Sequence, residues 1–152
     1  RLKRLRAAQA RAGEKPVPLI EVVDAFLYPI LRAAMREDGP DSTFIRVVGM
    51  SFSEQGGLFN ELARKYFAEV RNEFGAALAA ALPQYNEEEI GWRFHFAVCS
   101  ALATLANHGR YERFHMGNLD PDDIPGMMRR LRDFLVGGLT APVSEVELGG
   151  LS

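Results

Sequence analysis

Apolar residues recur every three or four positions along most of this 152-residue chain, and no long stretch alternates apolar and polar residues. The clearest stripe consists of Leu58, Leu62, Tyr66, Val70, Phe74, Leu78 and Leu82. Residues at this spacing lie on one side of an α-helix, whereas a half-buried strand requires a period of two. The pattern therefore predicts an all-α fold.

Turn and capping residues divide the chain into about six helices. Gly13, Pro83 and Gly109 are the clearest stop signals, because glycine and proline end helices readily. Asp120-Pro121-Asp122-Asp123 combines a capping residue with a proline suited to the first helical turn. Helices are expected at about residues 1–12, 18–36, 41–52, 58–82 and 86–107, and from this last capping sequence to about residue 140.

Composition and charge narrow the class of protein. The hydrophobic content of 47% suits one globular domain. The net charge of −2 means that the chain as a whole lacks the excess positive charge typical of nucleic-acid-binding domains. Residues 1–15 nevertheless carry six Arg and Lys side chains against one Glu. No apolar stretch is long enough to span a membrane. The single cysteine, Cys99, excludes an intrachain disulfide and fits a reducing cytoplasm.

Residues with catalytic or metal-binding chemistry are few. His95 and Cys99 are four residues apart on one helix face, but a structural zinc site needs four ligands. Glu69 and Glu73 fit a solvated face, and no glycine pattern matches a phosphate-binding loop. We therefore expect no enzyme activity, no metal and no cofactor. A small enzyme using His95 and Cys99 is the weakest of the readings.

Large aromatic residues are concentrated in and around the middle helices. Such side chains can line an apolar cavity between helices, or they can simply fill the core. Pro29 lies inside a helix, where it should introduce a kink and loosen the packing. The residues concerned are Phe26, Phe44, Phe52, Phe59, Phe67, Phe74, Trp92, Phe94 and Phe96.

The fifth expected helix is apolar on nearly all sides, which is typical of a helix packed on two faces. One of its faces carries mostly small residues and would allow a second helix to approach closely. Together with the sixth helix it could form a four-helix bundle about a two-fold axis. The residues expected at this dimer interface are Ala97, Ala101, Thr104, His108, Met127, Met128, Leu131, Phe134 and Leu135.

Four segments together resemble the C-terminal domain of tetracycline-repressor (TetR) family transcriptional regulators. They are Phe26-Leu27-Tyr28-Pro29-Ile30-Leu31, Phe44-Ile45-Arg46-Val47-Val48, Ala80-Ala81-Leu82-Pro83, and Glu89-Ile90-Gly91-Trp92-Arg93-Phe94-His95-Phe96. The chain resembles the branch of the family with acyl or other hydrophobic effectors. The resemblance implies a helical domain that binds a small hydrophobic effector and forms a homodimer through its last two long helices.

The resemblance also implies positions for the site and for the parent protein. Residues 1–15 would join a helix-turn-helix DNA-binding domain outside this chain to the ligand-binding and dimerisation domain at 16–140, with a tail at 141–152. Effector binding would then release operator DNA from the parent. Arg46, Tyr66 and His95 would be polar anchors, and Phe26, Pro29, Phe44, Val48, Phe67, Trp92 and Phe96 would surround the cavity. The alternative is a helical protein-interaction module with no small-molecule site.

Overall fold

The computed structural model describes residues 1–34, 57–106, 120 and 123–144. Within these residues it contains five helices and no strand, which confirms the all-α prediction. The helices are α1 (Leu2–Ala12), α2 (Leu19–Ala34), α4 (Gly57–Ala81), α5 (Glu87–Ala106) and α6 (Ile124–Thr140). The expected helix at 41–52 lies outside the described residues.

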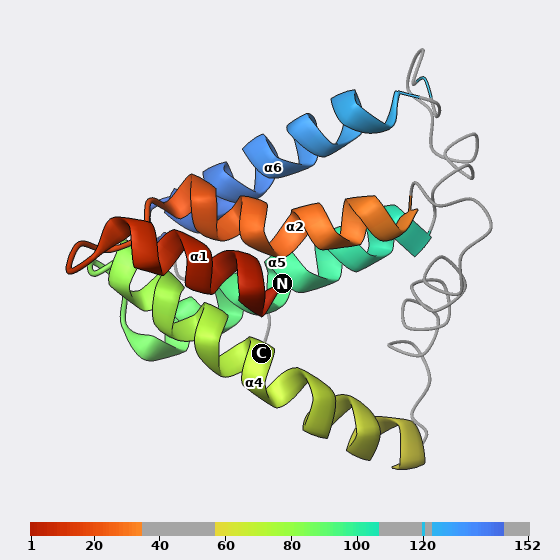
Figure 1. The fold of residues 1–152 in the computed structure, drawn as a ribbon, viewed down its shortest axis with the longest axis horizontal. Helices are drawn as coiled ribbons and strands as arrows, with labels where there is room; N and C mark the ends of the chain where they lie inside the picture. Colours follow the sequence, from red (N-terminus) through yellow and green to blue (C-terminus); the bar gives the residue numbers. More distant parts are fainter. Residues whose placement is uncertain (35–56, 107–119, 121–122, 145–152) are drawn as a thin grey trace, which may run out of the picture.

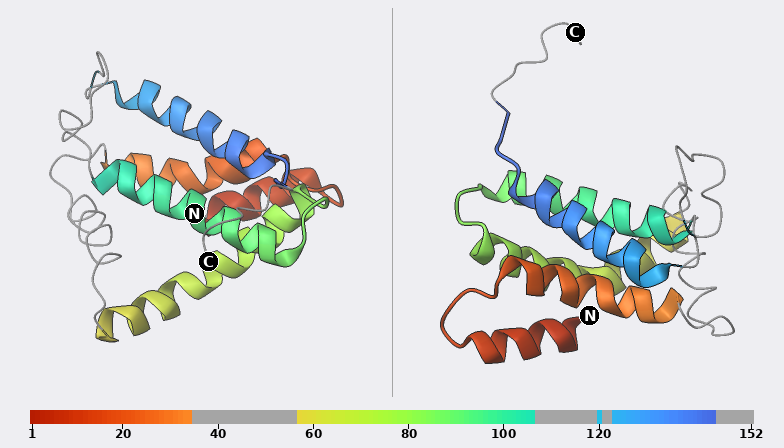
Figure 2. Two further views of the ribbon diagram at one scale, coloured as in Figure 1. Left: turned by 180° about the vertical axis from the view of Figure 1, so that it is seen from behind. Right: turned by 90° about the horizontal axis from the view of Figure 1, so that it is seen from above.

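The helices are arranged in three layers. Helices α2 and α4 form the middle layer, with α1 on one side and the α5–α6 pair on the other (Figure 2). Helix α1 packs on α2 and α4, α2 packs on α6, and α4 packs on α5. The C-terminal half of α4 joins the other helices at one end of the molecule, and its N-terminal half diverges from them (Figure 1).

Two helix boundaries follow from local signals in the sequence. Helix α1 ends at Gly13, which has a φ of 63° and donates its N–H to Gln9 O at 3.0 Å. Glycine occupies this left-handed region without the steric cost that other residues meet. Helix α5 is capped by Asn86, whose Oδ1 accepts a 2.8 Å hydrogen bond from the N–H of Glu89.

Helix α6 begins later than the capping sequence suggests. Its N-cap is Asp123, whose Oδ1 accepts the N–H of Gly126 at 2.9 Å, and Pro125 lies in the first turn. A Cβ atom at Gly126 would overlap the Asp123 carboxylate, which would then have to move. Asp123 also contacts the guanidinium of Arg130 at 3.3 Å. The cap is therefore Asp123 and not Asp120.

The Asp123 cap gives helix α6 a predictable dependence on pH. The hydrogen bond from Gly126, followed by the bond from Arg130, holds the pKa of Asp123 below its ordinary value of 3.8. A depressed carboxyl pKa means that the stabilisation is complete at neutral pH and is lost as the pH falls through the folded-state pKa. Asp123→Ala should lower the melting temperature at pH 7, and the difference from the unsubstituted chain should shrink as the pH falls below 3.8 and through the lowered folded-state pKa. Asp133→Ala, on the same helix, is the control.

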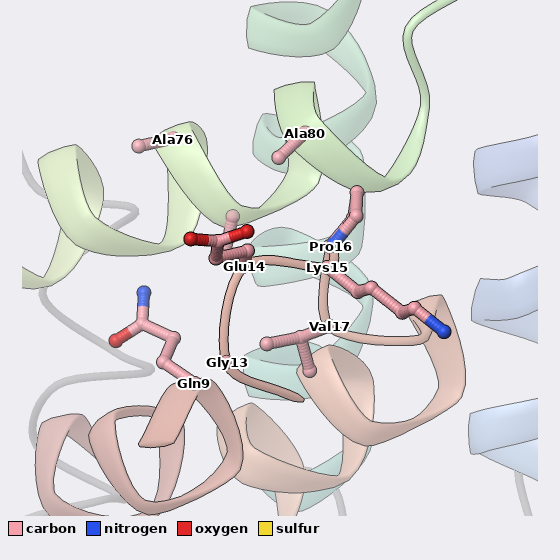
Figure 3. A pocket seen from close by; sticks show the side chains of 9 residues that line it. Gln9, Gly13, Glu14, Lys15, Pro16, Val17, Ala76 and Ala80 are labelled. Atoms are coloured by element: carbon pink, nitrogen blue, oxygen red, sulfur yellow. The ribbon is translucent and has the colours of Figure 1, made fainter. Parts of the chain in front are cut away.

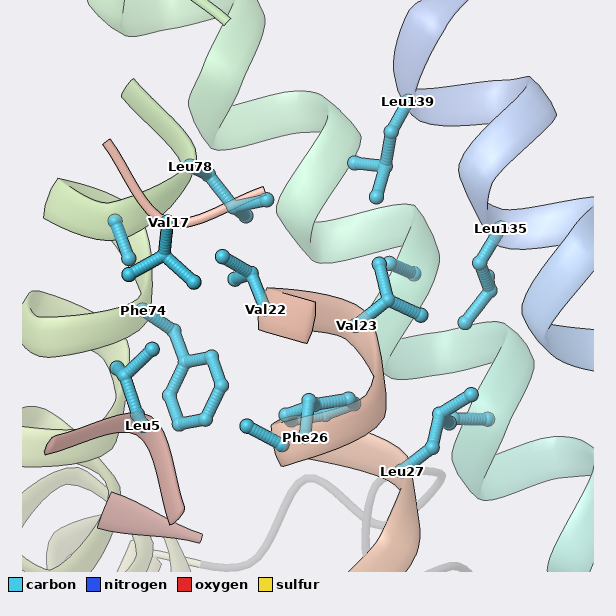
Figure 4. Packing of buried hydrophobic residues seen from close by; sticks show 14 of the residues in the cluster. Leu5, Val17, Val22, Val23, Phe26, Leu27, Phe74, Leu78, Leu135 and Leu139 are labelled. Atoms are coloured by element: carbon cyan, nitrogen blue, oxygen red, sulfur yellow. The ribbon is translucent and has the colours of Figure 1, made fainter. Parts of the chain in front are cut away.

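The core lies where the three layers meet. Phe74, Leu5, Leu27 and Val22 are its largest fully buried side chains, and they come from three helices (Figure 4). Leu135 and Leu139 extend the core into α6. Because a buried leucine or phenylalanine contributes about 1.5–3 kcal/mol of transfer free energy, this contact holds α1, α2, α4 and α6 together.

Helix α1 belongs to this core, to which it contributes buried side chains. Leu5 is 0% exposed. Basic residues on the surface of α1 contact acidic and aromatic side chains. Arg6 forms ion pairs with Glu69 at 2.8 Å and with Glu73 at 3.3 Å. The Arg4 guanidinium stacks 3.5 Å from the centroid of the Tyr28 ring. Arg6, and Arg11 through Glu21, are therefore paired with carboxylates within the domain.

None of the described helices combines the length and the apolar character that crossing a membrane requires.

Candidate functional site

An aromatic cluster occupies the centre of the described residues. The Phe26 ring makes edge contacts with Phe74 and Phe94, at centroid distances of 5.6 and 5.9 Å, and Phe74 stacks on Phe94 at 6.5 Å. The adjoining cavity has a volume of only about 20 Å³. Pockets for drug-sized ligands measure about 300–1,000 Å³, so this part of the interior is packed core. Phe26, expected to surround an effector, here packs against other side chains.

Trp92, His95 and Phe96, the three α5 residues expected around the cavity, lie on the exposed side of α5, away from the aromatic cluster. Trp92 and Phe96 are 55% and 59% exposed, and His95 is also exposed. The rings of Trp92 and Phe96 stack on each other at 5.8 Å, and His95 lies about equally close to both. The structure therefore does not bring these residues together with Phe26.

The small-residue face of α5, expected to meet a second subunit, is buried within the chain. Ala101 is 0% exposed, and Ala97 lines the small cavity beside Leu135 and Leu139. Their small side chains let the neighbouring helices approach α5 closely. On α6, the residues Met128, Leu131 and Leu135 are buried as well, and Met127 is partly buried against the core. Thr104 is partly exposed and donates to Ser100 O, and His108 lies outside the described residues.

Among the described residues of the expected dimer interface, one faces solvent. Phe134 of α6 is 68% exposed, more than any other large hydrophobic side chain among the described residues. Because α5 and α6 form an outer layer, Trp92, Phe96 and Phe134 make up what we call the outward face. Large exposed aromatic residues of this kind are typical of surfaces that bind another protein.

The remaining expected effector residues are in other parts of the chain. Pro29 is partly exposed within α2, which continues to Ala34. Tyr66 and Phe67 belong to the N-terminal half of α4, although the placement of their side chains is not described. Phe44, Arg46 and Val48 lie outside the described residues.

Two open grooves flank helix α4. The first, of about 270 Å³, lies between the α1–α2 turn and Ala76 and Ala80 (Figure 3). Gln9, Glu14 and Lys15 border it. The second, of about 550 Å³, runs between α4 and α5 over Gly75, Ala79 and Gly91. Both are open to solvent, and small residues form part of their walls. Arg71, Asn72, Tyr85 and Glu87 also line the second groove.

The His95–Cys99 pair is brought together as its spacing suggests. Cys99 Sγ lies 3.6 Å from His95 Nε2. No third ligand joins them, because in the described part of the chain no three His, Cys, Asp or Glu side chains are gathered as a metal site requires.

Arg93 has a larger role than the sequence indicates. Its spacing from Glu89 suggests an ordinary surface ion pair, and the two side chains do meet at 2.7 Å. The Arg93 side chain, however, is only 8% exposed and also donates to the carbonyls of Gly138 and Leu139, at 2.7 and 3.1 Å. Its guanidinium stacks 4.0 Å from the ring centroid of Tyr85. Nothing in the spacing of residues 89–93 reveals contacts with residues 45 positions away.

Comparison with known proteins gives one result. Residues 24–138 match the family model described as a tetracyclin repressor-like C-terminal domain. No curated protein and no solved structure matches the chain at a significant level.

Proposed function

Because the chain belongs to the family of tetracyclin repressor-like C-terminal domains, we propose that it is the effector-binding and dimerisation domain of a transcriptional regulator. The C-terminal domains of this family are regulatory rather than catalytic. The observation that carries the proposal is the family match together with an exposed aromatic surface on the two helices that end the domain.

The outward face is our proposed dimer surface. Trp92 and Phe96 lie one turn apart on α5, and Phe134 lies on the neighbouring helix α6. A two-fold axis through this layer would pair two copies of α5 and α6 as a four-helix bundle. Each of the three aromatic residues would then lie in the interface twice, once from each subunit. Of the interface residues expected from the sequence, Phe134 stays in this proposal. The buried alanines instead hold α5 against its own subunit.

We place the effector site toward the end of the molecule where α4 diverges from the other helices. The central cluster of Phe26, Phe74 and Phe94 leaves room for about one water molecule, so an effector must bind elsewhere. The divergent half of α4 carries Tyr66 and Phe67, and Pro29 lies in the half of α2 that leads away from the packed end (Figure 1). In this proposal Phe44, Arg46 and Val48 complete the site, with Arg46 as the anchor for a polar group.

Coupling to DNA would follow from the usual linkage between two ligands. An effector that favours one subunit arrangement weakens operator binding by the parent protein by the same factor by which DNA weakens effector binding. This coupling is typically about 1–3 kcal/mol. DNA contact would come from a helix-turn-helix domain of the parent. On α1, Arg6 already pairs with Glu69 and Glu73, and Arg4 stacks on Tyr28.

The packed interior favours a second candidate, a helical dimerisation module with no small-molecule site. Thermal melting separates the two candidates. An effector that binds only the folded chain should raise the melting temperature with its concentration, by the equivalent of about 2.7 kcal/mol at one hundred times its Kd. We would screen fatty acids, acyl-CoAs and other small hydrophobic compounds.

The variants in that experiment locate the site. Arg46→Ala should reduce the saturable shift produced by an anionic effector, whereas Phe134→Ala, on the outward face, should leave the effector Kd unchanged. A panel that gives no shift while the chain remains dimeric would reject the effector proposal and favour the dimerisation module.

A further inference from the structure

The C-terminal end of helix α6 is capped by side chains from a different part of the chain. The last carbonyls of any α-helix lack partners within the helix. Here Arg93 Nη1 donates to Gly138 O and Leu139 O, and the Tyr85 hydroxyl lies 3.0 Å from Thr140 O and 2.8 Å from Ala141 O. A cation at this position also interacts favourably with the negative end of the helix dipole.

The Arg93 guanidinium is fully engaged despite its burial. Glu89 Oε1 accepts from Arg93 Nε at 2.7 Å, and the Tyr85 ring covers the guanidinium plane. Arginine keeps its charge when buried, and its planar fork can serve a carboxylate and two carbonyls at once. We call Tyr85, Glu89 and Arg93 together the α6 clamp. The clamp joins the start of α5 to the end of α6.

The clamp lies at the same level as the outward face. Arg93 directly follows Trp92 in α5, and Gly138 lies one helical turn after Phe134 in α6. The hydrogen bonds from Arg93 to Gly138 and Leu139 therefore fix how Trp92 and Phe96 on one helix lie relative to Phe134 on the other.

We propose that Arg93 is a positioning residue for dimerisation: without facing the second subunit itself, it holds α6 on α5 so that the outward face is already in its binding arrangement. This inference rests on the proposed dimer. A binding surface that is ordered before association loses less conformational entropy when the complex forms. Arg93 would then contribute to dimer affinity through preorganisation.

Two substitutions loosen the clamp without removing its bulk. Arg93→Lys keeps the charge but loses the planar guanidinium group with its several N–H donors. Tyr85→Phe keeps the stacked ring but loses the hydroxyl. We expect each to weaken the dimer of the full 152-residue chain about tenfold, measured by sedimentation equilibrium at a temperature where both variants are fully folded. Arg129→Lys, at an exposed arginine of α6, is the matched control and should leave the dimer Kd unchanged.

Hydrogen exchange supplies a readout of the clamp itself. Amides in the last turn of α6 should exchange faster in both clamp variants, while those of α1 and α2 keep their wild-type rates. Faster exchange at the end of α6 with an unchanged dimer Kd would overturn the inference and leave the proposed function intact. If Arg93→Lys fails to fold, the same criteria apply to Tyr85→Phe. Failure of the proposed dimer surface itself would give a different result, because Phe96→Asp would then leave the association of the chain unchanged.

Discussion

Replacing Phe74 with alanine is expected to lower the free energy of unfolding by about 3–5 kcal/mol. Phe74 is 1% exposed and contacts the rings of both Phe26 and Phe94. Truncation removes the buried apolar surface and enlarges a cavity that already exists beside the ring. Since domains of this size are stable by only about 5–15 kcal/mol, one such change removes a large share of the total.

Urea unfolding followed by circular dichroism measures this loss. Dimerisation would add its own stability, so the comparison should be made in a Phe96→Asp background. Phe134→Ala is the matched control, because it makes the same chemical change at a side chain that is 68% exposed. We expect the control to shift the unfolding free energy by less than about 0.5 kcal/mol. Equal effects of the two substitutions would show that the aromatic cluster is not the core.

Phe96→Asp is expected to raise the dimer Kd by at least about 100-fold. The substitution removes a large aromatic contact and places a carboxylate where the proposed interface excludes water. A two-fold axis brings this change into the interface twice. The monomer should keep its fold, because Phe96 is 59% exposed in the single chain.

Sedimentation equilibrium over a dilution series gives the Kd. Ile20→Asp is the control, since Ile20 is an exposed hydrophobic residue on α2, outside the α5–α6 layer. It should leave association unchanged. A dimer that resists Phe96→Asp but is weakened by Ile20→Asp would place the interface on another face of the molecule.

The sequence was sufficient to predict the five helices that the structure describes. Gly13 and Asn86 act through hydrogen bonds within a few residues, so local signals locate the end of α1 and the start of α5. The start of α6 was placed less well. Three aspartates, Asp120, Asp122 and Asp123, are candidates for the cap, and their spacing does not decide among them. In the structure Asp123 accepts the N–H of Gly126.

The orientation of α5 could not be predicted from its own sequence. Its two faces are both apolar, so periodicity does not decide which one enters the core. Hydrophobicity alone favours burying Trp92 and Phe96, but the structure buries Ala97 and Ala101. The reason is packing between layers: alanines permit close contact with neighbouring helices, which two stacked aromatic rings would prevent.

The α6 clamp shows the same limit for polar residues. Glu89 and Arg93 have the spacing of an exposed i,i+4 pair, which is usually worth about 0.2–0.5 kcal/mol. Only the tertiary arrangement brings Gly138 and Leu139 within reach of that guanidinium and makes Arg93 a buried helix cap. Contacts between distant segments leave no signal in the spacing of either one.

The fluorescence of Trp92 tests the proposed dimer face most directly. It is the chain's single tryptophan, and it lies on the outward face with 55% of its surface exposed. If two subunits meet there, the emission maximum should shift to shorter wavelength as the chain concentration rises, over the same range in which sedimentation shows a dimer. A dimer that forms while the Trp92 emission stays constant would contradict this account.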